Sequence, residues 1–274
     1  MMISAAAHKN EEKDMKSLYD ALIDGIPDDM PLDDMTCTHY GVLVRSGENI
    51  GIADFRDEYD TRPMIETGNK LDLSLKELAT GIKSWNITEA AMGHAAINAY
   101  YNTPAMAKKN GLVLTGSLTA EDRNSDPFIA YQKEVHGKKV VVVGHFPYLE
   151  KLMAPICDLK IIDPTPDAGI YPEQAAEYLL PEADFAFIGS LTITDKRLPR
   201  YLELARDAFV GIVGPITTLS PVLFDYGVDE LDGFVVKDNA VAERIVKEQE
   251  NLKIYSAGQK VSLRKAEYEA FMKK

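Results

Sequence analysis

The chain has few cysteines and no long apolar segment. Its 274 residues include two cysteines, Cys37 and Cys157, which stand far apart and outside any Cys-x-x-Cys pair. Two isolated thiols are too few for a disulfide scaffold or a cysteine-only metal cluster, and they fit a reducing compartment. The apolar start, 1–7, lacks a basic leader, and no run approaches the ~20 apolar residues that span a bilayer. We therefore expect a cytoplasmic protein with no membrane partner.

Positive charge is also scarce. The 30 basic residues are outnumbered by 43 acidic ones, which gives a net charge of −13. Such a chain repels phosphate backbones, and its longest basic cluster is the pair Lys138 and Lys139. We therefore expect no nucleic-acid partner. The apolar content of 46% and the charged content of 27% are those of a globular chain, which is long enough here for two domains.

The N-terminal half mixes helical and strand patterns. Apolar periodicity and the capping residues Ser74 and Asn86 predict helices over 15–26, 75–83 and 87–101. The β-favouring runs 36–45 and 50–55 flank a short turn-like segment and predict a hairpin. Together these patterns predict an α+β domain over residues 1–135.

The C-terminal half contains four short, mainly apolar runs. They are Val140–Val143, Leu159–Ile162, Phe185–Ile188 and Val210–Val213. Segments of helix length separate them, and a last helix is expected at 239–250. Unbroken strands alternating with helices predict a parallel sheet with helices on both faces. The predicted fold class is therefore α/β with two domains, of which the Rossmann-like one spans 136–274.

The loop after the first of these strands carries a histidine at the expected mouth of the sheet. Ligands of doubly wound sheets bind outside the carboxyl ends of the strands. Gly144 is a lone glycine rather than a G-x-G-x-x-G motif, so a bound dinucleotide is disfavoured. His145 is suited to titrate near neutral pH or to ligate a metal, and the alternative is that it caps its own loop.

Three later loops offer oxygen ligands at the same edge. The candidates are Asp163, then Thr192 and Asp195, then Gly214, Thr217 and Thr218. Each has a structural alternative, because acidic and hydroxyl side chains also close turns and cap helices. Both interpretations stay open at this point.

The predicted helix 87–101 is rich in alanine and glycine, which indicates a buried, central position. Glu89 and Asn98 are nine residues apart and therefore face opposite sides of a straight helix, so one of them is structural. Asn98 shares a face with His94 and could bind a ligand with it. The commoner explanation is a buried asparagine whose side chain forms hydrogen bonds with backbone groups.

Two further sets of residues could bind a metal, but their sequence patterns are less specific. Cys37 and His39 alternate along a predicted strand and could hold two corners of a zinc or copper site, but no other cysteine or histidine lies nearby in sequence. The acidic segment 54–60, with Asp54, Asp57, Glu58 and Asp60, lacks the pattern of an EF-hand and indicates a solvated loop.

Several short motifs, in order, resemble the DUF4213/DUF364 family of heavy-metal chelation proteins. They are Lys83–Asn86, Gly93 with Ala96–Ala99, Val143–Pro147, Leu180–Asp184, Gly214–Pro215 and Pro221–Phe224. The resemblance extends over about residues 15–263. It implies an enolase N-terminal-like domain, a Rossmann-like domain, an active site in the cleft between them, and a link to anaerobic cobalamin-related metabolism.

The resemblance also implies site residues. Asn86, Glu89 and Asn98 correspond to the family's helix motif, and His145 with the loop 214–221 corresponds to its sheet-mouth motifs. The chain departs from the family pattern at three positions, His94, Asp163 and Ile216.

Three functions follow from these observations. The leading hypothesis is a cleft that binds a metal or a metal-chelating small molecule, with His145, Asp163 and Asp195 as donors and a transition metal as the candidate cofactor. The alternative is a metal-independent enzyme for a small polar or anionic substrate, with His145 as general acid or base. The third is a scaffold in which the cleft is only a seam. A homodimer is the expectation from base rates.

Overall fold

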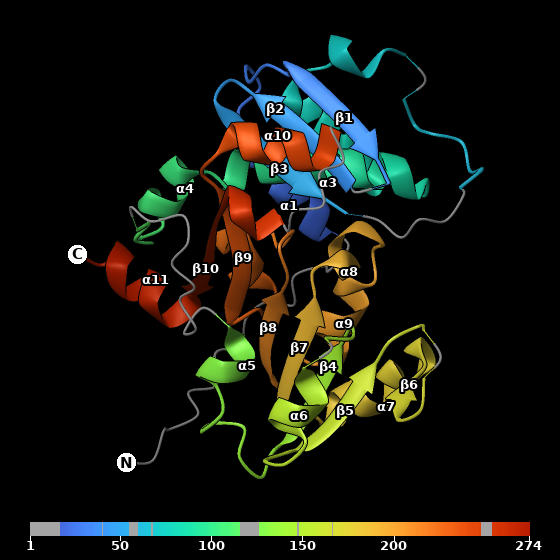
Figure 1. The fold of residues 1–274 in the computed structure, drawn as a ribbon, viewed down its shortest axis with the longest axis vertical. Helices are drawn as coiled ribbons and strands as arrows, with labels where there is room; N and C mark the ends of the chain where they lie inside the picture. Colours follow the sequence, from blue (N-terminus) through green and yellow to red (C-terminus); the bar gives the residue numbers. More distant parts are fainter. Residues whose placement is uncertain are drawn as a thin grey trace.

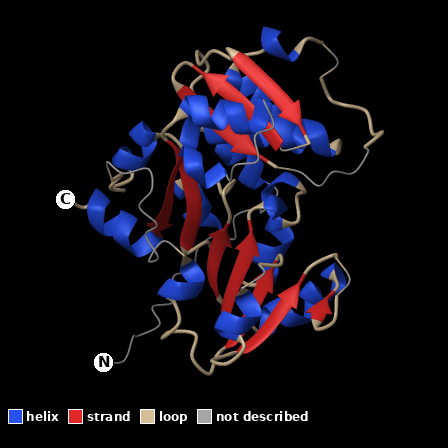
Figure 2. Cartoon of the chain, viewed as in Figure 1, coloured by secondary structure: helices blue, strands red, loops and turns tan. Residues whose placement is uncertain are grey.

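The computed structural model of the chain describes residues 17–39, 41–54, 60–66, 68–115, 126–146, 148–165, 167–247 and 254–274. Its strands form two sheets (Figure 1). The smaller is antiparallel and consists, in spatial order, of β1 (Asp34–Thr38), β2 (Gly41–Ser46) and β3 (Asn49–Ala53). The larger has seven strands, and helices cover the strands of both sheets (Figure 2).

The predicted strand 36–45 is wrong as a single element, because the chain reverses within it. Thr38 pairs with Gly41, so this run forms the end of β1 and most of β2. Gly41 has a φ of +126°, and a Cβ there would lie 2.7 Å from the Ala53 carbonyl oxygen, so the reversal requires glycine. The hairpin predicted between the two runs is confirmed, with Ser46 opposite Asn49.

The helix α3 (Ile87–Tyr101) is the centre of the N-terminal part. Asn86 caps it as predicted, and nearly every side chain along it is buried. It packs on β2, β3 and the helical segment formed by α2 (Leu75–Ala79) and a 3-10 turn (Thr80–Lys83). A Cβ on Gly93 would lie 2.7 Å from the Gly81 carbonyl carbon and closer still to the Ile82 nitrogen. The small residues therefore allow the backbone to approach closely on more than one side.

The larger sheet has the spatial order β10-β9-β8-β7-β4-β5-β6. Its strands are β4 (Lys139–Val143), β5 (Asp158–Ile162), β6 (Ile170–Tyr171), β7 (Phe185–Gly189), β8 (Phe209–Val213), β9 (Glu230–Val236) and β10 (Gly258–Arg264). Neighbours are parallel except β9 and β10. Strand β4, the first in sequence, lies inside the sheet. The chain adds β5 and β6 on one side of β4 and then β7 to β10 on the other. The boundary between β4 and β7 is therefore the switch point of the sheet, the usual place for a ligand crevice. All four predicted strands are confirmed.

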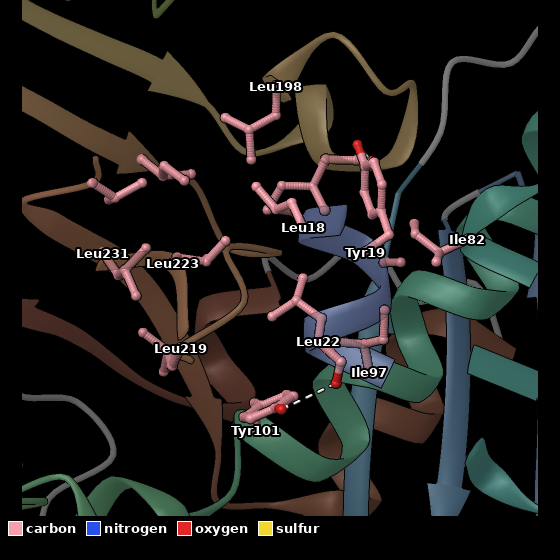
Figure 3. Packing of buried hydrophobic residues seen from close by; sticks show 14 of the residues in the cluster. Leu18, Tyr19, Leu22, Ile82, Ile97, Tyr101, Leu198, Leu219, Leu223 and Leu231 are labelled. Carbon is pink, nitrogen blue, oxygen red and sulfur yellow. Dashed lines mark hydrogen bonds between the residues drawn. The ribbon is translucent and has the colours of Figure 1, made fainter. Parts of the chain in front are cut away.

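Helices from both ends of the sequence cover the larger sheet. One face packs on α5 (Pro127–Ala130) and α6 (Leu149–Met153), through an aromatic cluster around Phe128. The other packs on α9 (Leu198–Leu204) and the 3-10 helix η7 (Pro221–Tyr226), together with α1 (Leu18–Asp24). Leu18 and Leu22 of α1 lie among Leu198, Leu223 and Leu231 (Figure 3). The remaining α-helices in the described part of the chain, apart from α10 (Asn239–Lys247), are α4 (Pro104–Lys109), α7 (Ala176–Leu179), α8 (Leu191–Thr194) and α11 (Lys265–Met272).

The helix α10 (Asn239–Lys247) lies against the small sheet, although it follows strand β9 of the large sheet in the sequence. It packs on β1 and β2 (Figure 1), where Ala242, Ile245 and Val246 share a buried cluster with Leu43 and Ile52. Packing therefore crosses the predicted boundary near residue 136 in both directions, through α1 and α10. The boundary itself stays a prediction. In the described parts of the chain, no helix has the length and apolarity to cross a membrane.

Candidate ligand-binding cleft

A cleft of about 590 Å³ lies between the N-terminal end of α3 and the loop that follows α8. Arg62, Trp85 and Ile87 line it from the side of the small sheet. Asp195, Lys196 and Arg197 line it from the side of the large sheet, beyond the carboxyl end of β7. The cleft thus brings together segments that are far apart in the sequence.

Asp60 anchors the first wall of the cleft to the N-terminus of α3. Its carboxylate accepts a 2.6 Å hydrogen bond from the Ile87 N–H and 2.8 Å bonds from Nε and Nη2 of Arg62. The Arg62 guanidinium and the Ile87 N–H hold the pKa of Asp60 well below its ordinary value. The solvated-loop interpretation is wrong for Asp60, whose side chain is only 4% exposed. Asp57 and Glu58 lie outside the described residues.

Glu89 organises the segment behind this wall. Its carboxylate, 1% exposed, accepts from the Ile65 N–H at 2.6 Å, the Glu66 N–H at 3.0 Å and Lys70 Nζ at 2.6 Å. Burial raises the pKa of Glu89, but Lys70 and the hydrogen bonds outweigh this and the pKa is lowered. Asn86 Oδ1 accepts from the Glu89 N–H at 3.0 Å. In this geometry Asn86 and Glu89 hold the wall in place.

The second wall carries a lysine in an unfavourable backbone conformation. Lys196 has a φ of +67°, the one positive value among the described non-glycine residues. Its Nζ donates to the Thr194 carbonyl oxygen at 3.2 Å and lies 5.6 Å from the centre of the Trp85 ring. Burial lowers the pKa of Lys196 to about 8. Strained residues of this kind concentrate at functional sites.

Unlike Lys196, its sequence neighbours Asp195 and Arg197 form ion pairs in the described structure. Asp195 forms an ion pair with Arg197, and Arg197 also pairs with Glu173. Asp195 Oδ1 also accepts from the Arg197 N–H at 3.2 Å. Because the Arg197 guanidinium and N–H engage Asp195, a metal would have to displace Arg197 to bind this carboxylate.

Trp85 faces the cleft from the other side. It is the chain's single tryptophan, and 70% of it is exposed. Sequence reasoning missed Trp85, Arg62, Lys196 and Arg197 as site residues. Trp85 stands within the first motif of the family resemblance, and Lys196 directly follows the predicted ligand Asp195, so both are next to residues that the sequence singled out.

His94 and Asn98 lie instead in a buried polar seam with Thr218. Asn98 Nδ2 donates to the carbonyls of Ile52 and Ile216 at 2.9 Å each, and Thr218 Oγ1 donates to Asn98 Oδ1 at 2.7 Å. The backbone-tying explanation of Asn98 is therefore confirmed. Since Thr218 gives its proton to Asn98, its oxygen accepts from His94 Nε2–H at 3.1 Å.

The other side of His94 completes the seam. His94 Nδ1 accepts from Thr194 Oγ1 at 2.8 Å. Burial lowers the pKa of His94 to about 3, so the ring is neutral at pH 7. Of the other predicted hydroxyls, Thr192 Oγ1 donates to the Gly189 carbonyl at 2.8 Å, and the Thr217 side chain is buried. A ligand could reach the seam residues only if the seam opened.

The sheet-mouth residues lie where the topology predicts. Gly144, with a φ of +105°, ends β4 beside Gly189, and Gly214, with a φ of +143°, follows β8. His145 is exposed, and its Nε2 lies 3.1 Å from Glu150 Oε1. Asp163 Oδ1 accepts from the Thr165 N–H at 2.8 Å, which fits the turn interpretation.

The described side chains do not form a preassembled metal centre. Among them, no group of three or more histidine, cysteine, aspartate or glutamate residues lies close enough to hold a metal ion. His145, Asp163 and Asp195 therefore do not meet as one cluster, and their ligation of a metal stays a prediction. The cleft carboxylates Asp60, Glu173 and Asp195 are engaged by its two arginines. Lys196 and the Trp85 ring, which also line the cleft, suit an anionic organic ligand better than a bare cation.

Comparisons with known proteins agree with this fold. Sequence models of two families match, DUF4213 over residues 19–101 and DUF364 over residues 126–265, and both are described as "Putative heavy-metal chelation". An uncharacterized protein of Methanocaldococcus jannaschii is 29% identical over 169 residues, which span 57% of this chain and 60% of that protein.

Two crystal structures of DUF364 proteins with unknown function are also similar. One, from Desulfitobacterium hafniense, is 49% identical with a TM-score of 0.83, and the match covers 91% of this chain and 98% of that one. The other, from Pyrococcus horikoshii, is 20% identical with a TM-score of 0.75 over 91% and 99% of the two chains, and shares the fold. The chain described here therefore belongs to the DUF364 family.

Proposed function

We propose that this protein binds a small anionic molecule that chelates a heavy metal, and that it does so in the cleft between Trp85 and Lys196. The metal is then cargo, held mainly by the small molecule rather than by a set of protein side chains. The family's description supports the link to heavy metals. The chemistry of the cleft supports an organic ligand.

The position of the Lys196 ammonium carries this proposal. In the described structure it contacts a carbonyl oxygen and the Trp85 ring, whereas Arg62 and Arg197 are paired with carboxylates. Asp195 and Asp60 interact with Lys196 only beyond ion-pair distance, so this half-buried cation gains favourable electrostatic energy when an anion enters. The exposed Trp85 ring adds a flat apolar surface beside it. Together they suit a carboxylate-rich chelate of moderate size.

The single tryptophan makes this proposal testable by fluorescence. The protein is titrated with nickel(II) citrate, metal-free citrate and nickel(II) chloride, and Trp85 emission is followed. We expect saturable changes with the two citrate samples and none with nickel chloride. Lys196→Met should weaken citrate binding by about tenfold, the loss expected for one charge-assisted contact. Lys138→Met, at the opposite end of the sheet, is the matched control and should bind normally.

The opposite pattern would contradict the proposal. A response to nickel chloride that is abolished in the double variant His145→Ala, Asp195→Ala would instead support direct ligation by side chains. Equal citrate binding by wild type and Lys196→Met would remove Lys196 from the site.

One observation favours the enzymatic alternative. Glu150 contacts His145 Nε2 at the switch point of the sheet, and a carboxylate-oriented imidazole is a common general acid or base. This alternative requires an organic ligand that binds without metal, and its turnover should be lost in His145→Gln. The link to anaerobic cobalamin-related metabolism stays a prediction.

A further inference from the structure

A second cavity, of about 210 Å³, lies at the carboxyl end of β8 on the face covered by α5. Asp232 of β9 pairs with Val213 of β8, and Val213 belongs to the cluster around Phe128, so the Asp232 side chain is on this face. Phe146, Tyr148 and Tyr255 also line the cavity. It shares no lining residue with the Trp85–Lys196 cleft.

Asp232 is a buried acid with an unused oxygen. It is 5% exposed, and Oδ1 accepts a 2.6 Å hydrogen bond from Ser262 Oγ. Oδ2 is buried and has no hydrogen-bond partner among the described residues. Buried polar atoms are nearly always paired in folded proteins, so the unpaired Oδ2 of a residue that lines a cavity indicates a missing partner.

The surroundings of Asp232 favour its neutral form. Burial raises the pKa of Asp232 well above its ordinary value, and the negative charge of Glu230 raises it further. Glu230 lies two residues away on the same face and is engaged through both oxygens, by Tyr131 Oη and by Arg264 Nε at 3.0 Å. A neutral carboxyl group offers one O–H donor and one C=O acceptor side by side.

The rest of the cavity wall is largely aromatic, and its other charged residues are Asp126 and Lys260. Phe146 and Tyr148 both stand near Phe128, at ring-centre distances of 5.1 and 6.2 Å, and the Tyr148 hydroxyl donates to Asp126 at 2.9 Å. Lys260 Nζ lies 4.3 Å from the centre of the Tyr255 ring. Aromatic walls of this kind bind planar rings by stacking.

We propose that this cavity binds a flat nitrogen heterocycle that carries an amine next to a ring nitrogen. The Asp232 O–H donates to the ring nitrogen and its carbonyl oxygen accepts from the amine. The aromatic side chains cover the ring, and Lys260 stands where an anionic substituent would leave the cavity. The volume admits a nucleobase-sized ring system and is too small for a whole dinucleotide.

Adenine, adenosine and adenosine 5′-monophosphate are suitable probes for the full-length protein, followed by ligand-observed NMR and calorimetry. We expect saturable adenine binding that Asp232→Leu weakens by about tenfold or more, because the leucine removes both polar contacts. Asp232→Asn keeps a donor and an acceptor and should stay within about threefold of wild type. Lys260→Met should remove the preference for the monophosphate over adenosine. Thermal melting checks that each variant folds.

Lys196→Met separates this inference from the proposed function, since it alters the other cavity and should leave adenine binding unchanged. Two results would overturn the inference. One is no adenine binding at millimolar concentration by wild type. The other is equal binding by wild type and Asp232→Leu.

Discussion

The seam around His94 and the cleft around Lys196 lie between the same two parts of the molecule. The environments of their basic side chains are opposite in burial, in hydrogen bonding and in backbone strain. His94 is fully buried, both ring nitrogens have hydroxyl partners, and the ring is neutral. Lys196 is half-buried, takes a strained backbone conformation and faces an exposed aromatic ring. The comparison teaches that burial alone does not identify a site. A polar group whose hydrogen-bonding capacity is filled by the protein holds the structure together, whereas a half-buried cation with no ion pair among the described residues is available to a ligand.

Asn98→Ala should break the seam and have the largest effect. It removes the hydrogen bonds that the Asn98 side chain makes with the Ile52 and Ile216 carbonyls and with the Thr218 hydroxyl. We expect the free energy of unfolding to fall by roughly 2–4 kcal/mol, measured by urea denaturation. Asn110→Ala is the control, because among the described residues the Asn110 side chain makes one hydrogen bond, 3.4 Å long, to the Leu219 carbonyl, and the substitution should cost clearly less. Equal losses would show that Asn98 is not the centre of the seam.

Acid should destabilise the seam through His94. The folded pKa of His94 is about 3, below the ordinary value of about 6.5, so the unfolded chain binds the proton first. Stability is therefore present above about pH 6.5 and is lost as the pH falls toward 3. Urea unfolding at several pH values should show a shallower loss in His94→Gln. The matched variant His136→Gln, at an exposed position, should keep the wild-type slope.

Lys196→Gly should separate stability from binding. Glycine adopts a positive φ without strain, so we expect the variant to be more stable by about 1 kcal/mol, with weaker citrate binding. Chemical denaturation and Trp85 fluorescence measure the two effects on the same samples. Lys196→Ala keeps the strain and loses the charge, so it should bind as weakly without the gain in stability. A destabilised glycine variant would contradict the account of a strained lysine.

The pH dependence of binding should be the smallest effect. Because the pKa of Lys196 in the free protein is about 8, the ammonium loses its proton as the pH rises from neutral to about 9.5, and citrate binding should weaken over that range. Lys196→Arg, which stays charged, should bind with little change across it. Without ligand, stability should rise as the pH passes 8, since the unfolded lysine holds its proton more tightly. Parallel binding curves for the two proteins would exclude Lys196 as the titrating group.

Local patterns predicted most of the large sheet but not all of it. The runs in β4, β7 and β8 are buried on both faces and are therefore apolar, whereas the run in β5 contains the partly exposed Lys160 and was recognised from its other three residues. Strand β9 was missed because Glu230 and Asp232 interrupt it, although both acids are buried. Strand β10 lies at the edge and alternates in burial, and β6 has only two residues.

The cleft was harder to predict than the fold. Its walls come from residues 60–62, 85–87 and 195–197, and only the folded chain brings these segments together. The predicted donors His145, Asp163 and Asp195 do stand at the carboxyl ends of their strands or beyond. Sequence could not show that Arg197 engages Asp195, or that Lys196 has a positive φ. Those properties depend on tertiary contacts.

The most direct test of the central claim is native mass spectrometry of untagged wild-type and Lys196→Met protein, purified without added metal, with elemental analysis of the same samples. The account predicts that an organic ligand and a heavy metal copurify with wild type and that Lys196→Met loses both together. A stoichiometric metal that stays bound after the organic ligand is removed, in wild type and variant alike, would contradict it.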